Sequence, residues 1–264
     1  ADSLIVGTCN LGRAAGVVGI NAASGLIDKA LTKTALYVSY NNTLCITSAS
    51  GIVGNNNGTI KNSASMGNIY VESYHSYSSS RSGGGVVAGI AGIGNGKIYN
   101  SFNAGNLLCK DSTNAVGDCY LYGLGKNNYF ANTYNYGNMG GAVQKKYLFG
   151  KGIDAYNSYA LDGSADSTGS KVTDSYTYDA YAALGTGSMT YYNMEDGDEV
   201  QGTLLEALNH WVQYRADNLG ETYVAWKQGE KYPELDIEWN LEYSSSATSS
   251  SSSAESSSSV SSSS

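Results

Sequence analysis

One short segment recurs along this chain, and this repetition constrains the fold more than any other feature of the sequence. Residues 50–69 read SGIVGNNNGTIKNSASMGNI, and residues 91–107 repeat the pattern as AGIGNGKIYNSFNAGNL. Such repetition predicts a repeat architecture, because each short unit can bury its apolar face only against its neighbours. Three pairs of residues match at an offset of 38: Ile60 with Ile98, Asn62 with Asn100, and Gly67 with Gly105.

Weaker copies extend the pattern in both directions. Each copy has a short apolar strand, an Asn/Gly turn at which left-handed backbone costs little, and further short strands. The polar stretch 72–85 interrupts the pattern and is predicted to be a loop. The copies comprise a degenerate one at 16–28, two clear ones at 50–70 and 86–108, and later ones at 122–139, 148–159 and 172–178.

One asparagine recurs in the second strand of the unit, at Asn62, Asn100, Asn132 and Asn157. We expect these residues to stack as an internal ladder in which each side-chain amide bonds the next. The alternative is turn chemistry at exposed corners, with no ladder.

The composition agrees with stacked strands. Among 264 residues there are 33 Gly, 23 Tyr and only 1 Pro, and 14% of the residues are charged, against about 25% in a typical soluble domain. This balance suits short strands joined by Asn, Ser and Gly turns, and it disfavours a helical bundle.

The pattern G-[IVL]-[VA]-G-x-x-N-G-x-I-x-N-[SC]-[YFA]-x-x-G-N-[IVL] resembles the GLUG repeat of bacterial secreted and cell-surface proteins. Residues 51–69 fit it well, residues 89–107 nearly as well, and the later copies in part. Over about residues 15–160 the resemblance implies a right-handed parallel β-solenoid (β-helix) in an extracellular setting, and it transfers no catalytic residue. We therefore expect an all-β solenoid domain over residues 1–190.

Residues 191–243 differ in character, since they carry 3 Lys/Arg against 12 Asp/Glu, whereas residues 1–190 carry 12 against 10. Apolar residues at helical spacing predict one helix over roughly 199–215. The acidic cluster 195–199 would lie at its N-terminus, where the macrodipole favours negative charge; the alternative for this cluster is calcium binding. The ending AWKQGEKYPEL at 225–235 resembles the segment that follows GLUG arrays, which implies an acidic end cap.

Strict alternation of apolar and polar residues predicts a terminal strand over 235–243. We expect this strand to complete a sheet of another copy of the chain. At the other end, an apolar run begins with no evident amphipathic cap, although solenoid ends must be covered. The expected self-association residues are Leu4, Ile5 and Val6 in that run and Leu235, Ile237, Trp239, Leu241 and Tyr243 in the strand.

The tail, residues 244–264, is almost entirely serine and cannot bury a core. Such tracts in secreted proteins are linkers or O-glycosylated stalks. The expected glycosylation sites are Ser249, Ser250, Ser251, Ser252, Ser253, Ser256, Ser257, Ser258 and Ser259.

The four cysteines favour two disulfides and an oxidising compartment. Cys9 and Cys45 are separated by about one repeat, and Cys109 and Cys119 bracket a polar loop, so these two pairs are preferred among three connectivities. The alternative is buried free thiols. No CxxC spacing or neighbouring histidine indicates zinc.

No group of residues indicates catalysis, a cofactor or a metal site. His75 lies in the polar excursion and His210 on the predicted helix, and neither belongs to a nucleophile motif. A glycosidase needs two carboxyl groups about 5–10 Å apart, and sequence spacing alone does not decide this for the later copies. Their carboxylates are Asp154, Asp162, Asp166, Asp174 and Asp179.

Tyrosine recurs throughout the copies. We expect most of these rings to stack between layers and a minority to contact a sugar or a partner, because the ring is apolar and the hydroxyl is polar.

Together these features predict a non-enzymatic, secreted structural or adhesive protein that associates end to end with copies of itself into a surface fibre. A second hypothesis is a carbohydrate-binding or spacer module of a secreted polysaccharide-degrading system, with a cell-surface or plant-type polysaccharide as partner. A third is a lyase or hydrolase of the β-helix type. The sequence has no basic stripe for nucleic acid and no run of 18 apolar residues that would span a membrane; residues 1–3 are consistent with a mature N-terminus.

Overall fold

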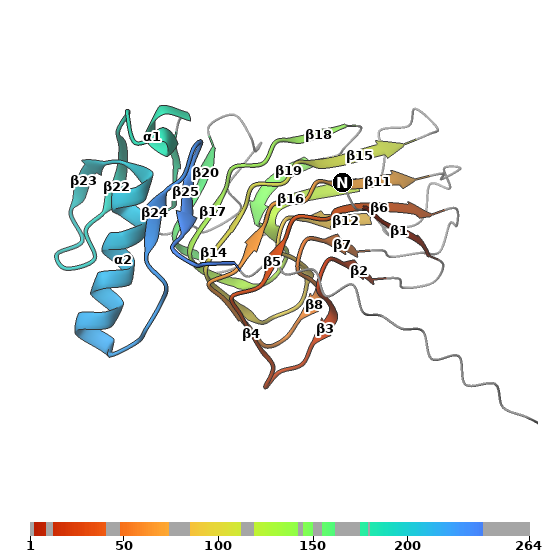
Figure 1. The fold of residues 1–264 in the computed structure, drawn as a ribbon, viewed down its shortest axis with the longest axis horizontal. Coiled ribbons are helices and arrows are strands. Elements are labelled where there is room, and N and C mark those ends of the chain that lie inside the picture. The colour runs from red at the N-terminus through yellow and green to blue at the C-terminus, as the bar shows by residue number, and fades with distance from the viewer. Residues whose placement is uncertain are drawn as a thin grey trace, which may run out of the picture.

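The computed structural model describes residues 3–8, 13–40, 48–73, 85–111, 119–141, 145–149, 155–161, 175–178 and 180–239. Most strands in these residues belong to three parallel sheets, and both helices lie in the C-terminal part (Figure 1). The expectation of an all-β, parallel fold is confirmed to this extent.

Each sheet collects strands from successive repeats. Sheet A comprises β1 (Ser3–Thr8), β6 (Ala35–Tyr40), β11 (Ile69–Ser73), β15 (Leu107–Asp111) and β18 (Met139–Gly141), in this order. Sheet B comprises β2 (Arg13–Ala15), β7 (Ser48–Ser50), β12 (Gly85–Ala88), β16 (Cys119–Gly125) and β19 (Lys145–Phe149), together with β3 (Val18–Asn21), β8 (Val53–Asn56) and β13 (Ala91–Ile93). Sheet C comprises β4 (Leu26–Asp28), β5 (Leu31–Thr32), β9 (Thr59–Lys61), β10 (Ala64–Ser65), β14 (Lys97–Asn103), β17 (Tyr129–Asn135), β20 (Ala155–Leu161) and β21 (Ser175–Tyr178).

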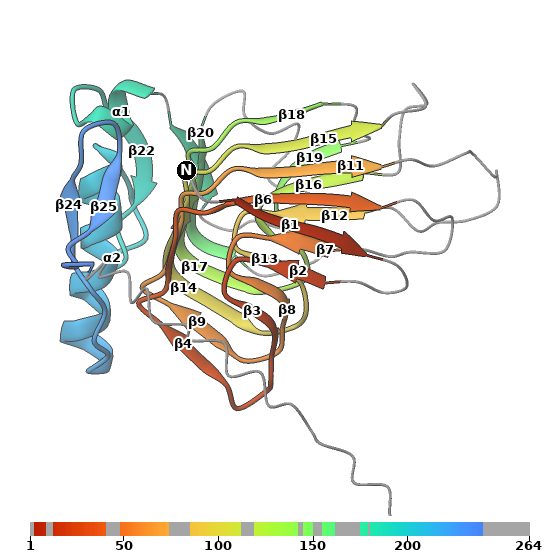
Figure 2. The same ribbon diagram turned by 45° about the vertical axis from the view of Figure 1, so that its right-hand side comes forward.

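The chain contributes to sheets A, B and C in turn, so one passage through the three sheets makes one layer, and the layers lie on one another (Figure 2). The strand register agrees with the alignment of the repeats, since Ile60 pairs with Ile27 in the layer before and with Ile98 in the layer after. Even the weak last copy contributes a strand, because β21 pairs with β20.

Alternate side chains of the strands fill two apolar clusters. One lies between sheets A and B and includes Val38 and Leu121, and the other lies between sheets B and C and includes Ile52 and Phe130. Burying one such side chain stabilises the fold by about 1.5–3 kcal/mol. Because successive layers continue both clusters, a layer depends on its neighbours for stability.

The repeated glycines and asparagines have different conformational reasons. The expected left-handed backbone is wrong for the turn that contains Gly58, which has no positive φ; a Cβ there would lie 2.3 Å from the carbonyl oxygen of Gly25 in the preceding layer. Glycine is therefore required by the close approach of two layers. In the equivalent turn of two later copies the expected positive φ is present, at Gly94 (φ 124°) and Asn127 (φ 61°). The repeated asparagines are left-handed as well, with φ of 49° at Asn62 and 46° at Asn100, a conformation that asparagine adopts more readily than most residues.

The C-terminal segment, which we define as residues 180–239, contains α1 (Ala180–Leu184), β22 (Met189–Tyr192), β23 (Glu199–Gly202), α2 (Leu204–Leu219), β24 (Trp226–Gln228) and β25 (Pro233–Leu235). It lies along the side of the stack, against sheet C (Figure 1). Its contacts run along the stack from Asn62 in the second layer to Asn157 on β20 in the fifth layer. The expected position across an end of the stack is therefore wrong: this segment covers a side.

Helix α2 begins later than the expected start at residue 199. Thr203 is its N-cap, and Glu206 completes a capping box by accepting from the backbone N–H of Thr203. This T-x-x-E motif outweighs the nearby acidic cluster, because it satisfies free N–H groups of the first turn directly. Residues 195–198 lie instead in the turn between β22 and β23, so the interpretation of the cluster as a helix cap is wrong.

The predicted strand over 235–243 is also wrong for the residues that the structure describes. Strand β25 ends at Leu235, and residues 236–239 form no strand. Leu235 is 1% exposed, while Ile237 and Trp239 pack on the cluster between sheet C and the C-terminal segment. An alternating pattern indicates that every second side chain is buried. Here the packed side chains of Ile237 and Trp239 belong to a segment that forms no strand.

Candidate functional site

The repeated asparagines form a hydrogen-bonded ladder. The side-chain amide of Asn100 donates to Oδ1 of Asn62 (2.8 Å), Asn132 donates to Asn100 (2.7 Å), and Asn157 donates to Asn132 (2.7 Å). All four residues are at most 2% exposed. The predicted ladder is confirmed, and the alternative of exposed corners is wrong.

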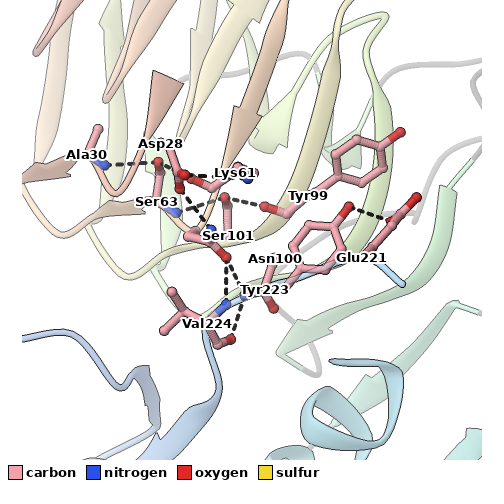
Figure 3. Close-up of polar contacts among 11 residues, drawn as sticks. Asp28, Ala30, Lys61, Ser63, Tyr99, Asn100, Ser101, Glu221, Tyr223 and Val224 are labelled. Atoms are coloured by element: carbon pink, nitrogen blue, oxygen red, sulfur yellow. Dashed lines mark hydrogen bonds and ion pairs between the residues drawn. The ribbon is translucent and has the colours of Figure 1, made fainter. Parts of the chain in front are cut away.

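The C-terminal segment covers this ladder and uses its remaining polar groups (Figure 3). The backbone N–H of Val224 donates to Asn62 Oδ1 (3.0 Å), and the carbonyl of Val224 accepts from Asn100 Nδ2 (2.8 Å). The indole N–H of Trp226 donates to Asn100 Oδ1 (2.6 Å). The ladder is thus an intramolecular docking surface, and its amides are already paired with protein.

Aromatic residues on the outer face of sheet C lie under the same segment. Phe102 and Tyr134 stack with ring centroids 5.1 Å apart, and both contact Trp226. The hydroxyl of Tyr134 donates to the carbonyl of Pro233. Phe102 and Tyr134 are at most 2% exposed and Trp226 is 4% exposed, so these rings are part of the core, as expected for most tyrosines.

The outer face of sheet B also buries its tyrosines. Tyr122 and Tyr147 stack at 5.6 Å and are 5% and 8% exposed. Burial, with a smaller contribution from Tyr147, raises the pKa of Tyr122 to about 12. This hydroxyl stays protonated at physiological pH, so it is no candidate for a base.

The outer face of sheet A is different. Tyr37 is 46% exposed and lies 5.8 Å from Tyr70 in the next layer, and Leu108 in the layer after that is 41% exposed. Tyr37 lies outside the clear repeats and was not singled out from the sequence. Its signal is the alignment of ALYVSY at 35–40 with IYVES at 69–73, which places two tyrosines in register.

The N-terminal end of the stack exposes apolar residues. Val17 is 45% exposed, although Ile52, its backbone neighbour in the second layer, is fully buried. Ile20 on β3 and Leu26 on β4 are 57% and 60% exposed. These three residues were not singled out from the sequence, which placed the uncovered N-terminal end at the apolar run of residues 4–6.

The expected self-association residues are divided by the structure. Leu4, Ile5 and Val6 lie on β1, the outermost strand of sheet A, which pairs with β6 on one side. The residues of the predicted terminal strand that the structure describes pack within the chain instead. Leu241 and Tyr243 lie outside the described residues.

The candidate chemical residues are not brought together. His210 accepts a hydrogen bond from the backbone N–H of Met194 (3.0 Å). In the acidic turn, Asp196 accepts from Asn193 Nδ2 and from the backbone N–H of Asp198. Within the described residues, no group of three or more His, Cys, Asp or Glu side chains is placed to hold a metal ion. The candidates that lie outside the described residues are His75, Asp154, Asp162, Asp166, Asp174 and Asp179.

Cys109 is disulfide-bonded and 1% exposed. The alternative of a free thiol is therefore wrong for this cysteine. Cys119, its preferred partner, lies on β16, and the pairing of the two stays a prediction. Cys9, Cys45 and the serines of the tail lie outside the described residues.

Neither helix in the described part of the chain is long and apolar enough to cross a membrane. No family model, curated protein or solved structure matches the chain. The resemblance to GLUG repeats therefore stays a prediction.

Proposed function

We propose that this chain is a right-handed parallel β-solenoid that acts outside the cell as a non-enzymatic structural protein, and that it associates with a second copy through its N-terminal end. The layered pairing of three parallel sheets supports the solenoid. Right-handedness follows from the strong general preference of crossovers between parallel strands of one sheet.

The observation that carries the proposed association is the open N-terminal end. The position of Val17 is filled in the next two layers by Ile52 and Ile90, which are fully buried, yet Val17 is 45% exposed. Within the described residues, β1, β2 and β3 are the terminal strands of their sheets. Unpaired edges and exposed core positions favour pairing with another chain.

The opposite end of the stack differs. Leu148 and Phe149 lie on β19, in the last layer of the described residues that has a strand in each sheet, and both are fully buried. A fibre that grows in one direction needs two open ends, so we favour a pair of chains joined N-terminal end to N-terminal end. Such a pair is related by a twofold axis, and the two copies of β1 would meet as antiparallel edge strands.

The disulfide at Cys109 supports an extracellular setting, because disulfides persist mainly in oxidising compartments. An intact mass of the native protein under non-reducing conditions tests this part of the proposal. We expect both disulfides and sugar on the serine tail; four free thiols and a bare polypeptide mass would contradict it.

The association is tested by light scattering coupled to size-exclusion chromatography over a wide concentration range. We expect the mass of two chains, and we expect Ile20→Lys with Leu26→Lys to weaken the pair at least tenfold. Leu219→Lys is the matched control, since Leu219 is 54% exposed at the end of α2. A monomer at high concentration, or equal weakening by the control, would overturn the association.

A further inference from the structure

We propose that the outer face of sheet A binds a neutral polysaccharide chain. This face carries two neighbouring columns of outward residues that run along the stack across β6, β11, β15 and β18. One column holds Tyr37, Tyr70 and Leu108, and the other holds Asn68, Asn106 and Asn138. The inference does not depend on the association of two chains.

Strand alternation places both columns on the same side of the sheet. Leu36, Val38, Ile69 and Val71 point inward and are at most 3% exposed. The residues between them point outward, because successive side chains of a strand lie on opposite faces. An asparagine directly before the strand and the second strand residue are two positions apart, so they are neighbours on the outer face.

The asparagine column is a row of oriented donors. Oδ1 of Asn68 accepts from the backbone N–H of Asn106 (2.9 Å), and Oδ1 of Asn106 accepts from the backbone N–H of Asn138 (3.0 Å). Because the oxygens of Asn68 and Asn106 are fixed in this way, the NH₂ groups of these two residues are left to donate elsewhere. Within the described residues no hydrogen bond of these NH₂ groups is formed, in contrast to the buried ladder, where Asn100 and Asn132 donate to protein.

The aromatic column supplies apolar surface beside these donors. The rings of Tyr37 and Tyr70 lie 5.8 Å apart at 47°, and Leu108 continues the column. A tyrosine ring is apolar with a polar tip, so it can stack on the C–H face of a sugar ring while the hydroxyls of the sugar accept from the amides. Neighbouring strands repeat every ~4.8 Å, which is on the scale of one sugar ring of an extended chain.

The charge and the area of this face favour a neutral glycan chain as its ligand. The charged outward residues beside the columns, Glu72 and Lys110, form an ion pair at 3.3 Å, so they add no net charge that would attract a nucleic acid or an acidic glycan. Five strands of about five residues make a face of roughly 400 Å², which is about half of the ~800 Å² per partner of a stable protein interface. A single glycan chain fits a face of this size better than a second protein.

The test is binding of the full chain to immobilised neutral glycans (glucan, xylan and mannan) and to polygalacturonate as a charged control, in low and high salt. We expect retention by at least one neutral glycan, little effect of salt, and at least tenfold weaker binding for Tyr37→Ala with Tyr70→Ala. Asn106→Ala should weaken binding as well. Tyr214→Ala, on α2, is the matched control and should bind as the parent does.

Circular dichroism and thermal melting establish that each variant is folded, so a loss of binding reports the face itself. Three outcomes would overturn the proposal: no retention by any neutral glycan, retention that the double variant does not change, or binding that requires the charged glycan. A protein partner on this face would also overturn the proposal. It would be seen as a molecular mass of the purified protein that rises with concentration, and this rise would be abolished by Tyr37→Ala with Tyr70→Ala but not by Ile20→Lys with Leu26→Lys.

Discussion

The outer faces of sheets A and C carry similar columns of aromatic and apolar residues. On sheet C, Phe102 and Tyr134 are at most 2% exposed, because Trp226 and the rest of the C-terminal segment pack on them. On sheet A, Tyr37 and Leu108 are 46% and 41% exposed. The same repeat therefore makes a core column where the chain returns to cover it, and an open column where it does not.

The two faces also differ in how their asparagines are satisfied. The ladder beneath the C-terminal segment bonds both to itself and to Val224 and Trp226. On sheet A, Asn68 and Asn106 have their oxygens engaged by backbone N–H groups of the following layer. Buried amides must be paired to avoid a large cost, whereas exposed ones can leave donors for a ligand.

The largest expected effect is at the covered face. Trp226→Ala should lower the free energy of unfolding by about 3–5 kcal/mol, because it leaves a cavity beside Phe102 and Tyr134 and removes a bond to Asn100. Denaturant titration followed by tryptophan fluorescence and far-UV circular dichroism measures this loss. A change below about 1 kcal/mol, as for an exposed residue, would show that the segment does not hold sheet C as described.

The next largest effect is expected at the ladder, where two substitutions of one residue distinguish the contribution of the left-handed backbone to stability from that of the side-chain hydrogen bonds. Asn132→Ala should cost about 2–4 kcal/mol, since it strains a residue with φ of 54° and removes the ladder bonds to Asn100 and Asn157. Asn132→Gly should be less destabilising than alanine by about 1–2 kcal/mol, because glycine accepts a positive φ. Equal stability of the two variants would mean that the left-handed conformation costs nothing here.

On sheet B the expected effect on stability is smaller, and it is measured through the pH dependence of unfolding. The pKa of Tyr122 is raised by burial from 10.0 to about 12. Below pH 10 both folded and unfolded states keep the proton, and between pH 10 and 12 only the unfolded state releases it, so stability falls as pH rises. Tyr122→Phe should make the free energy of unfolding fall less steeply with pH in the alkaline range. Near neutral pH the free energies of unfolding of the parent and the variant should vary with pH in parallel. An unchanged slope in the alkaline range would contradict the burial of this hydroxyl.

The smallest effect on stability is expected at the open face. Tyr37→Ala with Tyr70→Ala should change the free energy of unfolding by less than about 1 kcal/mol, because only a half-exposed cross-strand pair is lost. Thermal and denaturant unfolding measure it. A loss as large as that of Trp226→Ala would show that these rings belong to the core, and would remove the contrast between the two faces.

Much of the layered fold can be predicted from the repeats. The offsets between equivalent residues match the strand register, as Ile60 with Ile98 shows, and the asparagine ladder follows from the same alignment. The reason is physical: each layer repeats the contacts of the one before it, so local pattern and global register agree. The prediction for the turn at Gly58 was wrong because a close approach between layers and a positive φ both select glycine.

The repeat pattern dictates the layers, their register and the residues that can form ladders, because these depend on contacts between neighbouring repeats. The position of the C-terminal segment, over a side of the stack rather than an end, is visible in the folded structure alone. It depends on packing between distant residues, such as Trp226 with Phe102 and Val224 with Asn62, which no local pattern encodes. This position leaves the N-terminal end and the outer face of sheet A open, and both proposed interactions use those surfaces.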